Sequence, residues 1–105
     1  MHETITLNKS IGEMAYAEFY ISVPLLNIDV ELKVELIETN MDLHRYRVSN
    51  QYYCFVLEND KPKLKRKKFD YYHPNWKLIE GAIKDETFLA DIIKAIERRL
   101  KRNSV

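Results

Sequence analysis

A run of cations is the densest group of chemically active side chains in this sequence. From Lys61 to Lys68, six of the eight residues are lysine or arginine and none is acidic. Such side chains neutralise the phosphates of nucleic acids and release counterions, so this stretch is a candidate nucleic-acid interface. The residues that would contact phosphates are Lys63, Lys65, Arg66, Lys67 and Lys68, and the aromatic residues that would stack on unpaired bases are Phe69, Tyr71, Tyr72 and Trp76.

The same run of cations also has a purely structural interpretation. A strand at the edge of a sheet exposes unpaired backbone groups, and natural proteins place lysines there to prevent pairing with another chain. Asn59-Asp60 has hairpin-turn chemistry, so Lys63 to Phe69 is expected to follow as such an edge strand. The sequence leaves both interpretations open.

A second group of cations lies near the carboxyl end of the chain. Its members are Lys94, Arg98, Lys101 and Arg102. Steps of four, three and one residues place them on one stripe of a helix. This stripe would extend the nucleic-acid surface if the fold brought both groups to one side of the molecule. The alternative is a solvated helix face, whose basic last turn favours the negative end of the helix dipole.

Carboxylates alternate along the sequence between residues 29 and 35. Asp29, Glu31 and Glu35 would share one strand face, with Lys33 between them. Side chains on one strand face point outward in parallel, whereas a calcium ion needs about six to eight converging oxygens, so we expect a solvated face. These acids would also face the lysine strand across the sheet or across a two-fold interface, where opposite charges stabilise by about 0.2–1 kcal/mol per pair.

Residue counts exclude several kinds of catalytic and cofactor site. Two glycines, Gly12 and Gly81, cannot supply a Walker loop, a dinucleotide fingerprint or a nucleophile elbow. The single cysteine, Cys54, excludes an internal disulfide and lies in the most apolar run, where we expect a packed and unreactive thiol. No metal-ligand spacing joins the histidines, which are His2, His44 and His73. We expect no catalytic residues, no metal and no cofactor.

Tyrosines are concentrated in two places and are further candidates for a ligand pocket. Tyr52-Tyr53 and Tyr71-Tyr72-His73-Pro74 combine apolar area with polar tips, which suits binding sites. The alternative is that these rings bridge the core and water on half-buried strands. An enzyme built from tyrosines, histidines and isolated carboxylates is one functional hypothesis, because no fold excludes a grafted site.

Two strands are expected in the first part of the chain. Residues from Ile28 to Leu36 alternate apolar and charged side chains, which predicts a strand with one face in water. Alternation from Ala15 to Val23 predicts the strand before it, and residues 24–27 form the turn of a hairpin. A competing pattern begins at Ser10, where the S-x-x-E spacing suits a helix capping box and would make residues 11–19 helical.

The spacing of apolar residues differs between the middle of the chain, where it suits strands, and the end, where it suits helices. After a turn at residues 40–42, residues 43–50 and 51–58 are expected to be strands, the second apolar on both faces and covered above and below. A short helix is expected from Trp76 to Lys84, and a long one after the N-cap Asp85. The apolar stripe of the long helix consists of Phe88, Leu89, Ile92, Ile93, Ile96 and Leu100.

These elements together predict an α+β fold. We expect an antiparallel, meander-like sheet of about five to six strands, followed by one short and one long C-terminal helix packed on the sheet. With 105 residues and no linker, the chain 1–105 is expected to be a single domain. The longest wholly apolar run, residues 52–57, is too short for a membrane span, and cysteine usage suits the cytoplasm.

The charge distribution gives the leading functional hypothesis. The formal net charge of +1 hides two halves of −6 (residues 1–60) and +7 (residues 61–105). With no catalytic constellation visible, this polarity favours a small non-catalytic binding or interaction module, whose partner is a protein or a second copy of the chain. The alternative is a nucleic-acid-binding protein that uses residues 61–68 together with Arg98, Lys101 and Arg102.

Overall fold

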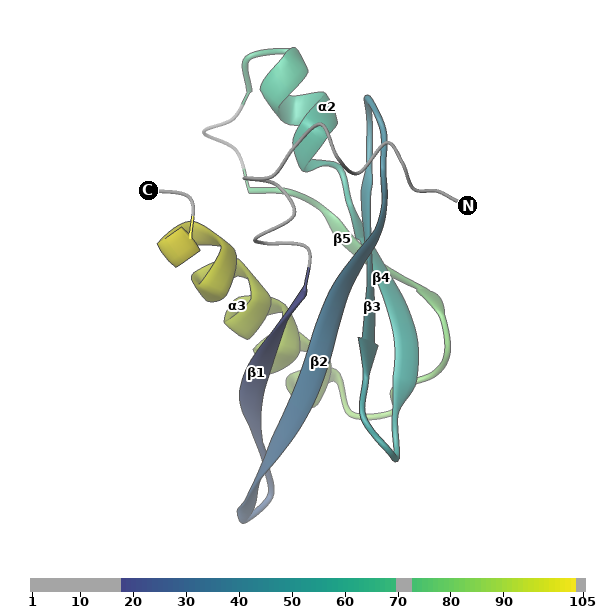
Figure 1. Ribbon diagram of the computed structural model, residues 1–105, viewed down its shortest axis with the longest axis vertical. Helices are drawn as coiled ribbons and strands as arrows, with labels where there is room; N and C mark the ends of the chain where they lie inside the picture. Colours follow the sequence, from purple (N-terminus) through teal and green to yellow (C-terminus); the bar gives the residue numbers. More distant parts are fainter. Residues whose placement is uncertain (1–17, 70–72, 104–105) are drawn as a thin grey trace.

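The sheet is an antiparallel meander with one long helix on one of its faces. The computed structural model describes residues 18–69 and 73–103 (Figure 1). The elements in chain order are β1 (Glu18–Leu25), β2 (Ile28–Thr39), β3 (His44–Ser49), β4 (Cys54–Asn59), α2 (Lys61–Arg66), β5 (Trp76–Glu80) and α3 (Glu86–Asn103). The strands pair in the order β1-β2-β3-β4-β5, each antiparallel to the next. The predicted α+β fold is therefore confirmed.

Short connections join the first four strands. Residues 26 and 27 form the turn between β1 and β2, within the predicted range, and Leu25 pairs with Ile28. Asn40 closes the next connection, where its Oδ1 atom accepts the backbone N–H groups of Asp42 and Leu43 at 2.8 and 2.9 Å. An asparagine side chain that bonds nearby backbone replaces a backbone turn in this way. The competing strand and helix predictions for residues 11–17 lie outside the described residues.

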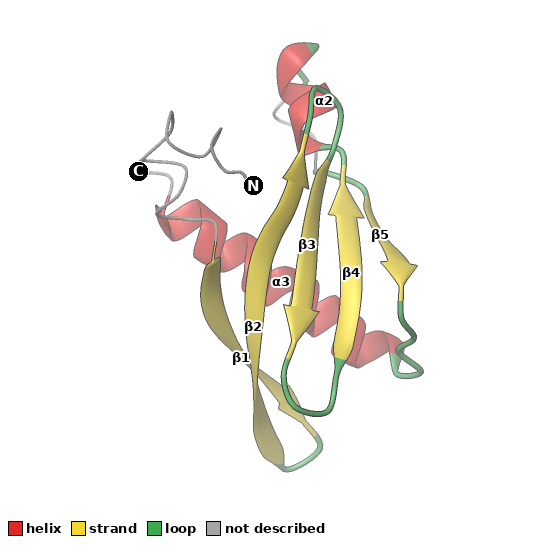
Figure 2. Ribbon diagram, turned by 45° about the vertical axis from the view of Figure 1, so that its right-hand side comes forward, coloured by secondary structure: helices red, strands yellow, loops and turns green. Residues whose placement is uncertain are grey.

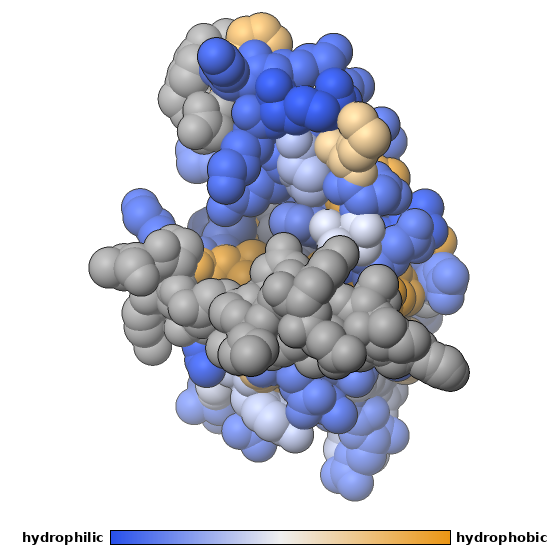
Figure 3. All heavy atoms as spheres, turned by 45° about the horizontal axis from the view of Figure 1, so that its top comes forward, coloured by the Kyte–Doolittle hydropathy of each residue, from blue (hydrophilic) through white to orange (hydrophobic). Residues whose placement is uncertain are grey.

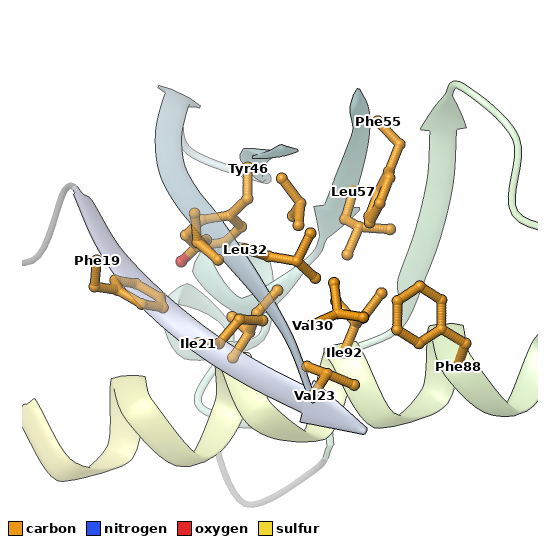
Figure 4. Packing of buried hydrophobic residues seen from close by; sticks show 13 residues of the cluster. Phe19, Ile21, Val23, Val30, Leu32, Tyr46, Phe55, Leu57, Phe88 and Ile92 are labelled. Carbon is orange, nitrogen blue, oxygen red and sulfur yellow. The ribbon is translucent and has the colours of Figure 1, made fainter. Parts of the chain in front are cut away.

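Helix α3 covers one face of the sheet, as its apolar stripe predicts. It begins after Asp85, whose Oδ1 atom accepts the N–H groups of Thr87 (2.9 Å) and Phe88 (3.2 Å), so the predicted N-cap is confirmed. The helix crosses one face of the sheet (Figure 2). Phe88, Ile92 and Ile96 are buried in the same cluster as the inward side chains of the strands, and Phe88 and Ile92 are labelled in Figure 4. Full burial of each such side chain stabilises the fold by about 1.5–3 kcal/mol.

The prediction that β4 is covered on both faces is wrong at its first residue. Phe55 and Leu57 point into the core, but Cys54 is exposed. Helix α3 covers only the core face, so a thiol on the other face at the start of β4 meets solvent. Val56 shares that face and is buried, because its strand neighbours Arg47 and Glu80 have long side chains whose stems shield apolar surface.

The structure exchanges the two predicted elements between residues 61 and 84. The expected lysine strand is the helix α2, since Pro62 occupies its first turn and lysine, leucine and arginine are good helix formers. The expected helix from Trp76 to Lys84 is instead the strand β5, because Trp76 and Leu78 alternate into the core. Gly81 then turns the chain with φ of 86°, a conformation in which glycine has no steric penalty.

Neither helix in the described ranges combines the length and the apolar composition needed to cross a bilayer.

Candidate nucleic-acid interface

The basic segment, residues 61–68, forms a short helix that projects beyond one end of the sheet (Figure 1). Its start is set by Asn59, whose Oδ1 atom accepts the N–H group of Lys61 at 3.0 Å. Its end is a Schellman motif, in which Phe69 N–H donates to the Leu64 carbonyl (2.7 Å) and Lys68 N–H to the Lys65 carbonyl (3.0 Å). Lys68 therefore has φ of 63°, where glycine is the usual residue.

All six cations of the basic segment are exposed. Arg66 donates to the Asp42 carboxylate at 2.5 Å. The other five, Lys61, Lys63, Lys65, Lys67 and Lys68, form no ion pair within residues 18–69 and 73–103. Hydrophilic side chains gather over α2 in the space-filling view (Figure 3). The segment thus presents a concentrated positive surface to solvent.

Two contacts hold the basic segment in place on the sheet. The Asp60 carboxylate, at the entry to α2, accepts the N–H group of Asn75 at 2.8 Å and its side-chain amide at 3.3 Å. These bonds tie the entry of α2 to the entry of β5. The Arg66–Asp42 pair ties the other end of α2 to the β2–β3 turn. Sequence reasoning did not find Asp42, Asp60 or Asn75, because their partners are 15 to 24 residues away.

The aromatic residues that follow the basic segment have different environments. Phe69 is 42% exposed and lies directly after Lys68. Trp76 instead faces the core, where its ring lies 5.8 Å from Tyr46 and its Nε1–H donates to Glu97 at 2.9 Å. Tyr71 and Tyr72 lie outside the described residues. Phe69 is therefore the aromatic ring that the structure places beside the cations and at the surface.

The second group of predicted contacts lies elsewhere on the molecule. Lys94, Arg98 and Lys101 are exposed on α3, and Arg102 is in its last turn. Both ribbon views place α2 beyond the end of the sheet and the carboxyl end of α3 beside the start of β1 (Figures 1 and 2). Arg99 turns toward β1, where it donates to the Tyr20 carbonyl at 3.2 Å and lies over the Phe19 ring. The fold thus places the two basic groups at different sites.

The outer face of the sheet neutralises its own charges. Arg45 bridges β2 and β4, with its guanidinium 3.0 Å from Glu38 and 2.9 Å from Glu58. The hydrogen bond to Glu58, together with the charge of Glu38, raises the pKa of Arg45 above its ordinary value. Arg47 similarly lies 3.6 Å from Glu35. The acids of this face thus pair mainly with β3 rather than with the basic segment, because β3 is the neighbour of β2 in the sheet.

A second surface feature is an open hollow of about 560 Å³ at the opposite end of the sheet from α2. It lies between the β1–β2 turn and the loop that joins β3 to β4. The residues that line it are Leu25, Ile28, Asp29, Val30, Glu31, Asn50, Gln51, Tyr52 and Tyr53. Tyr52 and Tyr53 thus line a concavity, and Tyr53 also packs on Phe88 at 5.6 Å, as the alternative of a ring between core and water expects.

The described residues contain no group of three or more histidine, cysteine, aspartate or glutamate side chains able to hold a metal ion. His44 is on β3, and His73 is exposed in the connection before β5.

Comparison of the chain with protein-family models, with curated proteins and with solved structures gives no match.

Proposed function

We propose that this protein is a non-catalytic binding module that contacts the phosphate backbone of a nucleic acid through the basic segment. The observation that carries this proposal is the exposure of six cations on one short projecting helix, five of them without an ion pair in the described part of the chain. An edge strand protected by lysines would have explained the same residues without a ligand. The segment is a helix, so that explanation does not apply to it.

The chemistry of the segment suits a polyanion with closely spaced charges. Each lysine or arginine that neutralises a phosphate releases condensed counterions, which makes the affinity fall steeply as salt is added. The Asp60–Asn75 bonds fix the base of α2, so its side chains are presented from a held backbone. Phe69, exposed beside Lys68, adds a surface on which an unpaired base stacks.

Compartment and partners belong to the same proposal. A single cysteine in 105 residues suits a reducing compartment, so we place the protein in the cytoplasm. Self-association, expected from halves of −6 and +7, is a separate prediction. Sedimentation velocity at two ionic strengths tests it, and a monomer at every concentration and salt would remove it.

The test is the binding of a labelled oligonucleotide of about 20 nucleotides, measured by fluorescence anisotropy in ~50 and ~200 mM salt. With four or five phosphate contacts, the affinity of the natural protein for a duplex should fall roughly 100- to 500-fold between these concentrations. The triple variant Lys63→Glu/Lys65→Glu/Lys67→Glu should lose this binding. A single-stranded oligonucleotide examines the contribution of Phe69, because Phe69→Ala should weaken only the single-stranded complex.

A matched control is available on α3. Lys94→Glu/Arg98→Glu/Lys101→Glu changes the net charge by the same amount but lies away from α2. We expect this variant to keep the affinity of the natural protein within a few-fold. Equal losses in both triple variants would show that only net charge matters. Weak binding with no dependence on salt would reject the proposal outright.

A further inference from the structure

Among the described residues, no strand pairs with one edge of β2 at the end of the β1–β2 hairpin. β2 pairs with β1 along its first residues, from Ile28 onward, but its pairing with β3 begins only at Lys33. The hairpin therefore extends past the β3–β4 loop, as both ribbon views show (Figures 1 and 2). Residues 28–31 have β1 on one side and the hollow on the other.

The backbone of this open edge presents hydrogen-bonding groups to the hollow. The Glu31 carbonyl points toward β3, because it accepts a hydrogen bond from the Asn50 side-chain amide at 3.1 Å. In a strand, residues two apart direct their N–H and C=O groups to the same edge. The N–H group of Glu31 and both backbone groups of Asp29 therefore face the open edge.

The opposite wall of the hollow is held by hydrogen bonds of Asn50, in addition to the packing of Tyr53 on Phe88. Asn50 Oδ1 accepts the N–H groups of Tyr52 (2.8 Å) and Tyr53 (2.9 Å), and the Asn50 N–H group donates to the Tyr53 carbonyl (2.9 Å). Its amide spans the gap to β2. The spacing between the open edge and the tyrosine loop is thus fixed before any ligand arrives, which lowers the entropic cost of binding.

The side chains around the hollow combine exposed apolar surface with uncompensated negative charge. Ile28 is 65% exposed and Tyr52 is 79% exposed. Asp29 and Glu31 are exposed, and neither carboxylate forms an ion pair in the described part of the chain. Edge-to-edge pairing of two copies in this register would place these acids against each other, which is destabilising. The charge complementarity instead favours a basic partner.

We infer that the hollow is a docking site for an extended peptide that adds as an antiparallel strand to residues 28–31 and alternates basic with apolar side chains. Main-chain hydrogen bonds to both backbone groups of Asp29 and to the N–H group of Glu31, whose carbonyl already accepts the Asn50 amide, provide affinity in this mode of recognition, and alternate side chains provide specificity. Residues of the peptide opposite Asp29 and Glu31 lie on the charged face and carry lysine or arginine. The residues between them lie on the side of Ile28 and Val30 and are apolar.

The probe is a fluorescein-labelled hexapeptide that alternates lysine and valine, titrated into the full chain. We expect weak but saturable binding, with a Kd of about 10 μM to 1 mM. Amide NMR shifts should be confined to residues 28–31 and 50–53. A peptide of the same composition with its lysines and valines in separate blocks should bind at least about tenfold more weakly. Methylation of the lysine backbone amides should abolish binding, whereas methylation of the valine amides, which point away from β2, should not.

Charge exchange provides the matched protein variants. Asp29→Lys/Glu31→Lys should lose the lysine peptide and bind a peptide that alternates glutamate and valine. Glu80→Lys/Asp91→Lys changes the net charge equally but lies outside the hollow, and it should behave as the natural protein does.

Four outcomes would overturn the inference. The first two are equal binding of the block peptide and insensitivity of binding to methylation of the lysine amides. The third is a set of shifts at residues 28–31 that depend on protein concentration alone, which would indicate a second copy of the chain. The fourth is a set of shifts at residues 28–31 on addition of an oligonucleotide. The first three outcomes do not involve nucleic acid, so this inference can fail while the proposed function stands.

Discussion

At the scale of a single residue, Lys68 is a cation in a backbone conformation that is unfavourable for lysine. A non-glycine residue in the left-handed region costs about 1 kcal/mol, and Lys68 has φ of 63° at the position where a Schellman motif favours glycine. A glycine there would keep the hydrogen bonds that end the helix. The presence of lysine is consistent with a role for its charge.

Replacement of Lys68 by glycine should therefore separate stability from binding. We predict that Lys68→Gly raises the free energy of unfolding by about 0.5–1 kcal/mol, measured by urea denaturation, while oligonucleotide affinity falls about tenfold at low salt. Lys67→Gly, whose φ is −90°, is the control, because there the glycine should only destabilise. A Lys68→Gly protein that is less stable than the natural one would contradict this account.

Tyr46 links the core to pH at the same scale. It is 3% exposed, and burial raises its pKa to about 12 from an ordinary value of 10. The unfolded chain releases this proton near pH 10 and the folded chain only near pH 12. The contribution of Tyr46 to the free energy of unfolding is therefore fully present below pH 10 and falls as the pH rises through this window, by roughly 3 kcal/mol.

The measurement is urea unfolding of the natural protein and of Tyr46→Phe between pH 8 and about 12. The difference in stability between the two should be constant below pH 10 and should shift in favour of the variant above it. Tyr20→Phe, at an exposed ring, controls for the loss of a hydroxyl group. Parallel curves for the natural protein and Tyr46→Phe across the whole range would show that burial does not perturb this phenol.

At the scale of elements, β5 is connected to α3 by the Trp76–Glu97 hydrogen bond of 2.9 Å. The bond joins an edge strand to the only helix that covers the sheet in the described residues, and its acceptor is a carboxylate. Hydrogen bonds to charged groups contribute about 1.5–3 kcal/mol. This contact therefore stabilises β5, which lies at the edge of the sheet and pairs only with β4.

A double-mutant cycle measures the strength of this contact. Trp76→Phe and Glu97→Ala should each lower the free energy of unfolding, measured in urea. The double variant should be destabilised by less than the sum of the two single effects, and the difference, which is the coupling free energy, should be about 1 kcal/mol or more. Glu97→Gln keeps an acceptor oxygen, so it should retain most of the coupling. Additive effects of the two single changes would mean that the bond contributes nothing to stability.

The sequence predicts the elements whose pattern is long and fails on those whose pattern is short. Strict alternation over residues 28–36 predicts β2, and the stripe through Phe88, Ile92 and Ile96 predicts α3, because each repeats many times. Residues 76–80 are too few to decide between Trp76 with Leu78 in a strand and Trp76 with Ile79 in a helix. Pro62 after Asp60 is typical of a helix start, but the edge-strand prediction for residues 63–69 did not use this signal.

The candidate sites, too, are predictable only where a local sequence pattern reveals them. The cations of the basic segment are visible as a charge run, although their helical presentation is not. The open edge of β2 depends on where β3 begins to pair, at Lys33, and register is a long-range property. Tyr52 and Tyr53 form one of two tyrosine groups considered for a pocket, against the alternative that their rings bridge the core and water, and nothing local places Asp29 and Glu31 beside them.

At the scale of the whole molecule, the two surfaces lie at opposite ends of the sheet and have opposite charge. The basic segment projects at one end of the sheet and the β1–β2 turn lies at the other (Figure 1). The hollow with Asp29 and Glu31 lies beside that turn. Between the two surfaces, the ion pairs of Arg45 and Arg47 with carboxylates of β2 and β4 neutralise charge on the outer face of the sheet. Two ligands of opposite charge would therefore bind without contact and with little electrostatic interference beyond a Debye length of about 8 Å.

The central claim is that the basic segment binds a nucleic acid. Amide chemical-shift mapping of the full chain, titrated with the oligonucleotide alone, tests it most directly. The account predicts that signals of the basic segment and Phe69 move, that the movement reverses as salt is raised, and that the exposed face of α3 stays unchanged. Shifts that are spread over the cations of α3 as strongly as over α2, or that persist in high salt, would contradict it.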